Sequence, residues 1–306
     1  MGTHVIAVVG ATATGKSRLA ISLARALDGE VVNADSMQLY RGMDIGTAKE
    51  PAAARQGVPH HLLDIWPVTQ PANVADYQKL AQAAIDDIAA RGRVPVLAGG
   101  SGLYVRAALD DLQFPGTDSA IRARLEDELA RLGPAALHAR LATLDPAAAS
   151  AILPGNGRRI VRALEVIELS GRPFTATMPS YAQVRPAVQI GLTLPRPELD
   201  VRIAARVDRM WQAGLEAEVR RLADQGLRDG RTASRALGYQ QLLRYLDGDC
   251  TLDEAHAETV TATKRFARRQ ESWFRRDPRV HWLNAADPQD RLLDQALHHL
   301  KSAGLP

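Results

Sequence analysis

Eight residues near the start of the chain have the types and spacing that bind a phosphate group. Backbone N–H groups of a G-x-x-x-x-G-K-[ST] loop form a concave anion site, and the dipole of the following helix adds positive potential. Lys16 would reach the terminal phosphate as a point charge, and the Ser17 hydroxyl would ligate a Mg²⁺ ion that bridges phosphate oxygens. The loop predicts a di- or triphosphate site without saying which molecule carries the group. Its residues are Gly10, Ala11, Thr12, Ala13, Thr14, Gly15, Lys16 and Ser17.

The segments around this loop predict the strand and the helix that would position it. Residues 5–9 form an unbroken apolar run, which is typical of a buried parallel strand. Residues 18–27 carry apolar side chains at helical spacing and predict a helix. Strand, loop and helix N-terminus in this order are the context that the motif requires, which favours a phosphate site over a chance glycine-rich turn.

Two candidate reactive side chains follow two other apolar runs. Asp35 lies in the segment 33–36 (NADS), and Ser101 lies in the segment 99–102 (GGSG). Ligands of open parallel sheets bind outside the carboxyl ends of the strands, so we expect both residues near the phosphate loop. There Asp35 can act as a base or hold a metal through water, and the glycines beside Ser101 permit a ligand to approach closely. Aspartate and serine at such positions also cap helices, and this alternative stays open for both.

Histidine and cysteine offer little for a metal site. His60 and His61 are adjacent, so their side chains point in different directions, and we expect loop hydrogen bonds from them instead of metal binding. Cys250 is the only cysteine, which excludes an intramolecular disulfide and a cysteine-based zinc site.

Two basic regions favour a phosphodiester backbone as a partner. Residues 264–276 carry six basic side chains against a single acid, Glu271, with aromatic residues between them. A second basic cluster comprises Arg158, Arg159 and Arg162, with Arg122 and Arg124 upstream. A solvated basic helix is the alternative interpretation of one such run. Two runs on a chain whose net charge is only +3 favour nucleic acid.

The order of apolar runs and helical patterns predicts an α/β fold, a parallel sheet flanked by helices as in P-loop NTPases. Strands are expected at 5–9, 30–34, 94–98, 188–194 and 280–283, and helices at about 76–90, 198–223 and 253–276. Between 115 and 185 the strand pattern disappears, and three or four helices are expected, one of them over 158–169. We therefore expect a core domain of residues 1–114 and 186–306 and an all-helical insertion domain of residues 115–185.

Length and composition set the broad class. The chain has 306 residues, of which 46% are hydrophobic and 24% charged, as in ordinary globular proteins. No apolar run approaches the roughly 20 residues of a membrane span. The first strand begins almost at the N-terminus, so we expect no signal peptide and a cytoplasmic location.

Longer segments of the chain resemble one family, the tRNA dimethylallyltransferases, also called tRNA isopentenyltransferases. The block 33–49 (NADSMQLYRGMDIGTAK) is close to the family's signature, and residues 58–64, 99–104, 159–165, 238–239, 268–273 and 280–283 also fit. Two positions depart from the family's pattern. Ala11 stands where proline is usual, which changes only loop stiffness, and Ser101 stands where threonine is usual, which keeps the hydroxyl. The zinc finger of some eukaryotic members is absent.

The resemblance implies a specific reaction. A dimethylallyl group would pass from dimethylallyl diphosphate to the exocyclic N6 amine of the adenosine at tRNA position 37, next to the anticodon. The phosphate loop and Mg²⁺ would hold the diphosphate, and Arg206 matches a family arginine that contacts it. Asp35 would accept the amine proton, and Ser101 would orient the amine or the leaving oxygen.

The resemblance also implies the anticodon stem-loop of tRNA as partner of a monomeric enzyme. The adenine would leave its stack to reach the diphosphate. Its pocket would be lined by Asp35, Ser36, Met37 and Gln38, beside Ser101. The other implied tRNA contacts are Arg122, Arg158, Arg159, Ile160, Val161 and Arg162 in the insertion, and Arg235, Ala236, Leu237, Gly238, Tyr239 and Gln240 in a loop of the core domain.

Three other functions remain as alternatives. A P-loop small-molecule kinase needs ATP and no RNA, so tRNA binding that weakens steeply with salt would separate it from a transferase. An enzyme that prenylates free adenine nucleotides has no evident use for the large insertion. An RNA-binding protein with a vestigial nucleotide pocket is disfavoured because Lys16, Ser17 and Asp35 are intact.

Overall fold

The computed structural model describes residues 4–112, 114–174 and 182–305 of the chain. It divides into two compact units, unit 1 comprising Met1–Leu109 and Gln183–Pro306, and unit 2 comprising Asp110–Ala182. The boundaries expected from the sequence, after residues 114 and 185, lie a few residues further along the chain. The described residues include no helix with both the length and the apolar character that crossing a bilayer needs.

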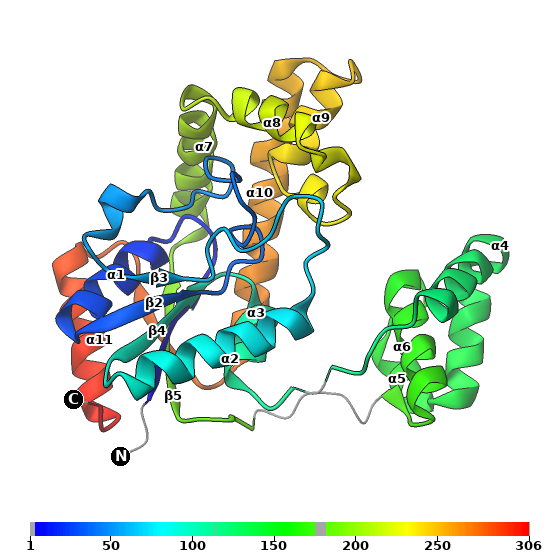
Figure 1. Cartoon of the computed structure of the whole chain (residues 1–306), viewed down its shortest axis with the longest axis horizontal. Coiled ribbons are helices and arrows are strands. Elements are labelled where there is room, and N and C mark those ends of the chain that lie inside the picture. The colour runs from blue at the N-terminus through cyan, green and yellow to red at the C-terminus, as the bar shows by residue number, and fades with distance from the viewer. Residues whose placement is uncertain (1–3, 113, 175–181, 306) are drawn as a thin grey trace. The chain divides into compact units, whose positions relative to one another are not determined.

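Unit 1 is built on a six-stranded parallel sheet with the strand order β3-β2-β4-β1-β5-β6 (Figure 1). The strands are β1 (Val5–Gly10), β2 (Gly29–Asn33), β3 (His60–His61), β4 (Val94–Gly99), β5 (Ala187–Thr193) and β6 (Val280–Asn284). The five strands predicted from the sequence are confirmed to within one residue at each end. Strand β3 was not predicted, because two residues are too few to show an alternating or apolar pattern.

Eight helices accompany this sheet in the described part of unit 1. They are α1 (Lys16–Ala26), α2 (Val74–Ala90), α3 (Gly102–Leu109), α7 (Arg196–Gln212), α8 (Leu215–Asp224), α9 (Tyr239–Leu246), α10 (Leu252–Phe274) and α11 (Gln289–Ser302). Helices α1, α7 and α11 share one apolar core with the strands, including the buried side chains of Ile6, Leu23 and Leu300. Helices α2 and α3 pack on each other and on β4. Burial of both sheet faces explains the uninterrupted apolar sequence of β1.

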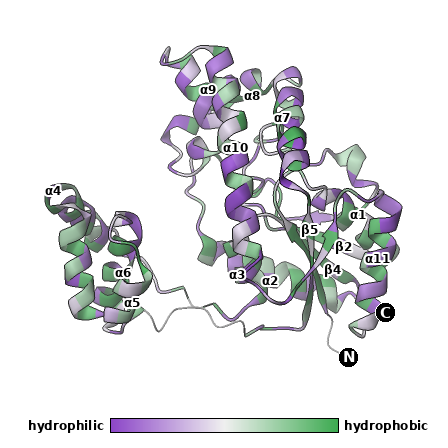
Figure 2. Cartoon of the chain, turned by 180° about the vertical axis from the view of Figure 1, so that it is seen from behind, coloured by the Kyte–Doolittle hydropathy of each residue, from purple (hydrophilic) through white to green (hydrophobic). Residues whose placement is uncertain are grey.

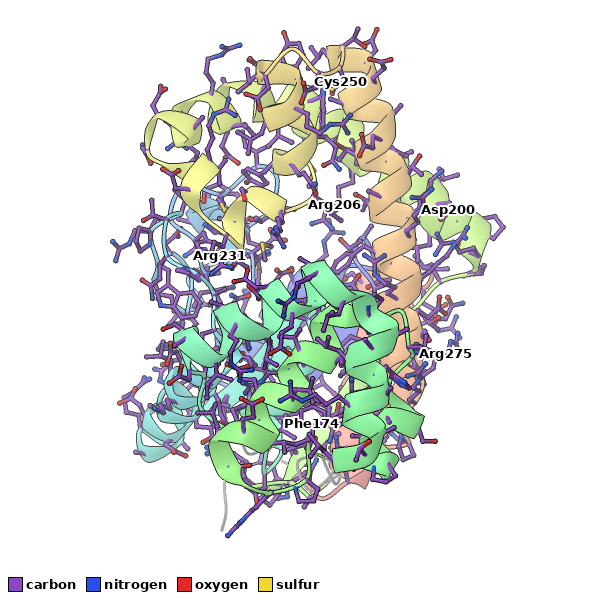
Figure 3. The ribbon with its side chains drawn as sticks, turned by 90° about the vertical axis from the view of Figure 1, so that its right-hand side faces the viewer. Phe174, Asp200, Arg206, Arg231, Cys250 and Arg275 are labelled. Carbon is purple, nitrogen blue, oxygen red and sulfur yellow. The ribbon has the colours of Figure 1, made fainter. Side chains whose placement is uncertain are left out.

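The prediction of one long helix over about 198–223 is wrong. The chain breaks between α7 and α8 at Gly214, whose φ of 91° lies in the left-handed region that glycine adopts without strain. Helix α10 begins where predicted, because Thr251 and Glu254 form a reciprocal capping box. Cys250, which is a free thiol, directly precedes the N-cap residue of α10, and Arg275 directly follows the helix (Figure 3).

Unit 2 contains three helical segments in its described residues: α4 (Ser119–Leu144), α5 (Pro146–Ala151) and α6 (Gly157–Ser170). Helix α4 is kinked at Gly133, so the prediction of three or four helices is confirmed. Apolar and polar residues alternate along all three segments (Figure 2). Their buried side chains, among them Leu125, Leu141 and Leu164, form a core of their own. Unit 2 therefore has the separate core that an independent domain needs.

Candidate active site

The phosphate loop connects β1 to α1, as predicted. Gly10 has a φ of 133°, and a Cβ there would lie 2.5 Å from the carbonyl oxygen of Leu192, so the position requires glycine. The Thr14 hydroxyl donates to the carbonyl oxygen of Ala11 at 2.8 Å, which closes the loop on itself. Gly15 caps α1 with a φ of 93°. The backbone is thus held in the curved shape that phosphate binding needs.

Lys16 and Arg206 bring positive charge to this loop. The Lys16 ammonium donates to the carbonyl oxygen of Ala11 at 2.6 Å, and the Arg206 guanidinium donates to the Thr12 hydroxyl at 3.0 Å. Burial and the charge of Arg206 lower the pKa of Lys16 to about 7, against the opposite effect of Asp35. Burial also lowers the pKa of Arg206. An anion between these two cations would favour their charged forms and raise both pKa values again, so the site is suited to a phosphate group.

Asp35 is held at the carboxyl end of β2 by the side chain of Asn33. The Asn33 amide donates to the carbonyl oxygens of Asp35 and Leu62, each at 3.0 Å, and its oxygen accepts the Asp35 N–H at 2.9 Å. Asp35 Oδ1 accepts the N–H of Met37 at 3.0 Å. The residues after Asp35 form a turn and not a helix, so the helix-cap interpretation of Asp35 is wrong.

Ser101 lies at the start of α3, and its hydroxyl contacts Ser36. Its carbonyl oxygen accepts the N–H of Val105 at 3.0 Å, which places Ser101 at the start of α3. Its hydroxyl accepts the N–H of Ser36 at 3.2 Å and lies 3.3 Å from the Ser36 hydroxyl. The carboxyl ends of β2 and β4 therefore meet where Ser36 and Ser101 touch.

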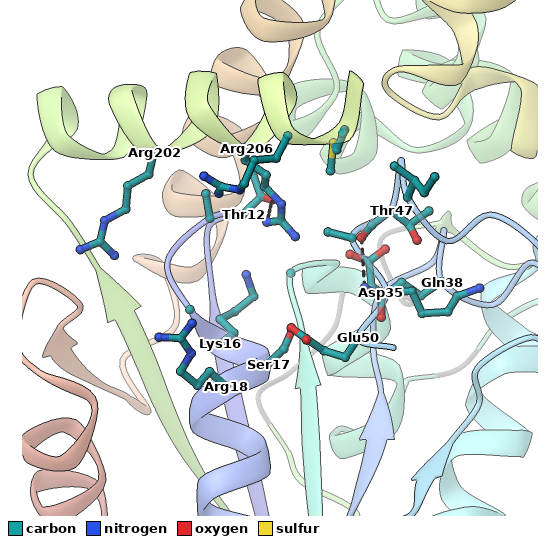
Figure 4. A pocket seen from close by; sticks show the side chains of 18 of the residues that line it. Thr12, Lys16, Ser17, Arg18, Asp35, Gln38, Thr47, Glu50, Arg202 and Arg206 are labelled. Atoms are coloured by element: carbon teal, nitrogen blue, oxygen red, sulfur yellow. Dashed lines mark hydrogen bonds between the residues drawn. The ribbon is translucent and has the colours of Figure 1, made fainter. Parts of the chain in front are cut away.

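The phosphate loop, Asp35 and Arg206 line a cavity of about 810 Å³ in unit 1, whereas Ser36 and Ser101 are not among its lining residues. Figure 4 shows Arg206 reaching from α7 towards Thr12, with Lys16 and Ser17 at the start of α1 and Asp35 across the cavity. Among the residues predicted for the site, Thr12, Ala13, Gly15, Lys16, Ser17, Asp35, Gln38 and Arg206 line it. Several other lining residues were not predicted as site residues, namely Arg18, Thr47, Glu50, Arg202 and Arg209.

Oxygen donors for a divalent cation line the cavity. Ser17, Asp35 and Glu50 all line it, and the Glu50 carboxylate points towards Ser17 (Figure 4). Hydroxyl and carboxylate oxygens are the ligands that Mg²⁺ prefers, so these residues fit that ion. Within the described ranges no group of three or more histidine, cysteine or acidic side chains forms a further metal site.

The two adjacent histidines make hydrogen bonds, as expected, but they lie in strand β3 and not in a loop. His60 Nδ1 lies 2.9 Å from the carbonyl oxygen of Val58. His61 Nε2 lies 2.6 Å from Glu30, a buried carboxylate at the start of β2 that also pairs with Arg91. The histidines therefore stabilise the edge of the sheet.

Glu218 on α8 holds the loop that follows Asp35, and it was not predicted as a site residue. Its carboxylate accepts the backbone N–H groups of Asp44 at 3.2 Å and Ile45 at 2.9 Å. The Tyr239 hydroxyl also donates to it, at 2.5 Å. Residues 44 and 45 line the cavity, so Glu218 shapes one of its walls from outside.

The predicted loop 235–240 is only partly a loop. Arg235 ends a 3₁₀ turn and Tyr239 begins α9. Tyr239 is fully buried and Gly238 is buried beside it, so these two predicted tRNA contacts are not exposed. Arg235 and Gln240 are exposed, Ala236 is buried and Leu237 is half-buried.

The arginines of unit 2 differ in their surroundings. Glu165 on α6 is fully buried and pairs with Arg122 and with Arg162. Burial would raise the pKa of Glu165, but the hydrogen bonds from the two arginines outweigh it, so the pKa lies below its usual value. Arg162 also donates to the carbonyl oxygens of Pro115 and Gly116. These two arginines therefore brace unit 2 internally.

The first turn of α6 is the exposed part of the predicted RNA-contacting segment. Arg158 and Arg159 are exposed there. Ile160 and Val161 are buried in the core of unit 2, so these two predicted tRNA contacts are not exposed. Helical geometry explains the difference, because successive side chains point in directions about 100° apart.

Comparison with known proteins agrees with this site. A family model described as IPP transferase matches residues 38–277. The tRNA dimethylallyltransferase of Thermobifida fusca is 69% identical over 302 residues, covering 96% of this chain and 95% of that protein. The tRNA dimethylallyltransferase of Streptomyces avermitilis is 71% identical over 283 residues, covering 92% of this chain and 91% of that protein.

Solved structures show the same fold. The tRNA isopentenylpyrophosphate transferase of Bacillus halodurans is 42% identical, with a TM-score of 0.72, and the match covers 98% of this chain and 96% of that one. A eukaryotic dimethylallyltransferase acting on tRNA has a TM-score of 0.85 at 25% identity, covering 99% of this chain and 80% of that one. With a family model that spans most of the chain and relatives above 65% identity along nearly all of it, the chain belongs to the IPP transferase family, the tRNA dimethylallyltransferases.

Proposed function

We propose that the cavity of unit 1 is where this chain carries out the family's reaction, the transfer of a dimethylallyl group to a tRNA adenosine. The donor is dimethylallyl diphosphate, and the acceptor is the N6 amine of the adenosine at position 37. The observation that carries the proposal is that one cavity is lined both by the phosphate loop and by Asp35. A base beside a diphosphate site is what N-prenylation requires.

The phosphate loop, Lys16 and Arg206 bind the diphosphate of the donor. They stabilise the negative charge that grows on the leaving oxygen as the allylic C–O bond breaks. Fixed cations lower a reaction barrier most when they lie beside charge that develops in the transition state. The Ser17 hydroxyl would hold Mg²⁺, with Glu50 as a further oxygen donor on the wall. Mg²⁺, when bound, supplies additional positive charge to the diphosphate oxygens.

Asp35 acts as the base. The N6 lone pair forms a bond to the allylic carbon, the C–O electron pair leaves with the diphosphate, and the amine proton passes to Asp35. The hydrogen bond from Met37 occupies Oδ1, which leaves Oδ2 for that proton. Ser101 orients the amine or the leaving oxygen, and Ser36, Met37 and Gln38 surround the adenine.

Unit 2 binds the anticodon stem-loop through exposed arginines of α6, with Arg158 and Arg159 as phosphate contacts. Arg235 and Gln240 are the exposed contacts of unit 1. The tRNA substrate favours a cytoplasmic location. One chain supplies the phosphate loop, the base and the metal ligands, so a monomer suffices.

The acceptor can be tested with synthetic anticodon stem-loops and labelled dimethylallyl diphosphate in the presence of Mg²⁺. We expect label in a stem-loop with adenosine at position 37. Its matched control carries inosine there, which differs in lacking the N6 amine, and should stay unlabelled. Equal labelling of both RNAs would contradict N6 as the acceptor. Transfer of phosphate from ATP to a small molecule, without labelling of RNA, would instead support a kinase.

A further inference from the structure

Gln270 on α10 is a buried amide that touches two walls of the cavity. Its Oε1 accepts the backbone N–H of Thr12 at 2.8 Å, and its Nε2 donates to the carbonyl oxygen of Gly100 at 2.9 Å. Thr12 belongs to the phosphate loop, and Gly100 directly precedes Ser101. The residue is only 5% exposed, so bulk water competes little for either hydrogen bond.

Both glycines that flank Ser101 are packed against α10. A Cβ at Gly100 would lie 2.3 Å from Nε2 of Gln270, and a Cβ at Gly102 would lie 2.1 Å from Cδ1 of Trp273. Gln270 and Trp273 are three residues apart and so lie on one face of the helix. The segment that carries Ser101 is therefore seated directly on α10.

We propose that Gln270 is a positioning residue, which fixes the separation between the phosphate loop and the segment that carries Ser101. This inference rests on the proposed function, in which the two walls hold the donor and orient the reacting groups. Transfer needs reacting atoms within about 3–3.5 Å and aligned, and a displacement of 1 Å can cost about 100-fold in rate. Gln270 acts through Thr12 and Ser101 and not on the substrate.

An amide is suited to this task because it accepts one hydrogen bond and donates another while staying neutral. Gln270→Met keeps an unbranched side chain of similar size but leaves the Thr12 N–H and the Gly100 carbonyl without that partner. Gln270→Glu keeps the acceptor for Thr12 and, while ionised, loses the donor to Gly100. A protonated glutamic acid has both functions again.

The experiment measures single-turnover transfer with saturating tRNA and donor, alongside the affinity for each substrate. We expect Gln270→Met to lower the rate roughly 10- to 100-fold while both dissociation constants change less than about threefold. Gln225→Met is the matched control, because Gln225 is exposed after α8 and its side chain makes no hydrogen bond to another described residue. It should behave as the wild type does.

Gln270→Glu adds a readout that a general loss of stability would not give. Its rate, divided by that of the wild type at each pH, should rise as the pH is lowered and the carboxyl group becomes protonated. Amide hydrogen exchange of the phosphate loop is a second measurement, and it does not depend on turnover. We expect faster exchange at Thr12 in Gln270→Met than in the wild type.

Two outcomes would overturn the proposal. One is a folded Gln270→Met protein with the wild-type single-turnover rate. The other is a loss of donor affinity as large as the loss of rate, since Gln270 would then serve donor binding alone. If Gln270→Met fails to fold, the Gln270→Glu variant decides. A rate relative to the wild type that does not change with pH would contradict the proposal. A wild-type chain that transfers no dimethylallyl group overturns the proposed function instead. Amide hydrogen exchange then still decides whether Gln270 joins the phosphate loop to the segment that carries Ser101.

Discussion

At the scale of single residues, the site depends on how charges are placed around Lys16. The phosphate-binding motif predicted its position because the spacing of the glycines dictates the backbone shape. The motif could not predict its protonation. Arg206 is remote in sequence, and burial together with this second cation lowers the pKa of Lys16 to about 7.

This lowered pKa predicts a proton uptake on donor binding. Above pH 7 the free enzyme holds a largely neutral Lys16, while a bound diphosphate favours the ammonium form and raises the pKa again. Affinity for dimethylallyl diphosphate should therefore fall as the pH rises from 7 to 9. Calorimetry at pH 8 in buffers of different ionisation enthalpy should show a fraction of a proton taken up. Lys16→Met should abolish that uptake, and an unchanged uptake in this variant would assign it to another group.

Asp35 leads to a prediction about rate. Asp35→Asn keeps an oxygen that can accept the N–H of Met37 but cannot take the amine proton, so turnover should fall roughly 10²–10⁴-fold. Affinity for tRNA should stay close to that of the wild type. Single-turnover kinetics measure the first effect, and a salt-controlled binding assay measures the second. Asp224→Asn, an exposed position on α8, is the control. A near-normal rate in Asp35→Asn would remove this residue from the mechanism.

At the scale of elements, the sequence predicted the strands better than the contacts between distant segments. Five strands were found because each is a short apolar run, whereas the break at Gly214 was missed because the apolar pattern of α7 continues into α8. That break matters for the cavity, since it turns α8 so that Glu218 meets the N–H groups of residues 44 and 45. A lone glutamate in a helical segment carries no sequence signal for such a contact.

Glu218 should therefore be needed for the stability of this wall. Glu218→Ala leaves backbone N–H groups and the Tyr239 hydroxyl without their acceptor, and we expect a loss of about 2–4 kcal/mol in the free energy of unfolding. Tyr239→Phe removes only one donor and should cost about 1 kcal/mol. Urea unfolding monitored by circular dichroism measures both. Equal stability of Glu218→Ala and the wild type would show that water replaces the carboxylate.

At the scale of the whole molecule, loss of the strand pattern predicted the helical insertion, but composition could not say which of its arginines are free. Glu165 decides this, because it is buried and takes Arg122 and Arg162 as partners. The spacing of three residues between Arg162 and Glu165 is a signal that could have been used. The free phosphate contacts are then expected at the start of α6.

Neutralising Arg158 and Arg159 together should lower the salt dependence of tRNA binding by about one to two units of log K against log salt. Donor affinity should not change, because the phosphate loop lies in unit 1. Arg162→Ala is the matched comparison, and it should lower the melting temperature of unit 2 by uncovering Glu165. Binding across a salt series checks the first expectation. An unchanged slope in the double variant would place the tRNA contacts elsewhere.

The central claim is that unit 1 joins a dimethylallyl group to a tRNA adenosine and releases the diphosphate. The most direct measurement incubates the wild-type chain with unmodified tRNA, labelled dimethylallyl diphosphate and Mg²⁺, then quantifies the released inorganic diphosphate and the labelled nucleosides. We predict one diphosphate for each N6-dimethylallyladenosine, found at position 37 alone. Diphosphate release without labelled tRNA, or label on another nucleoside, would contradict the account.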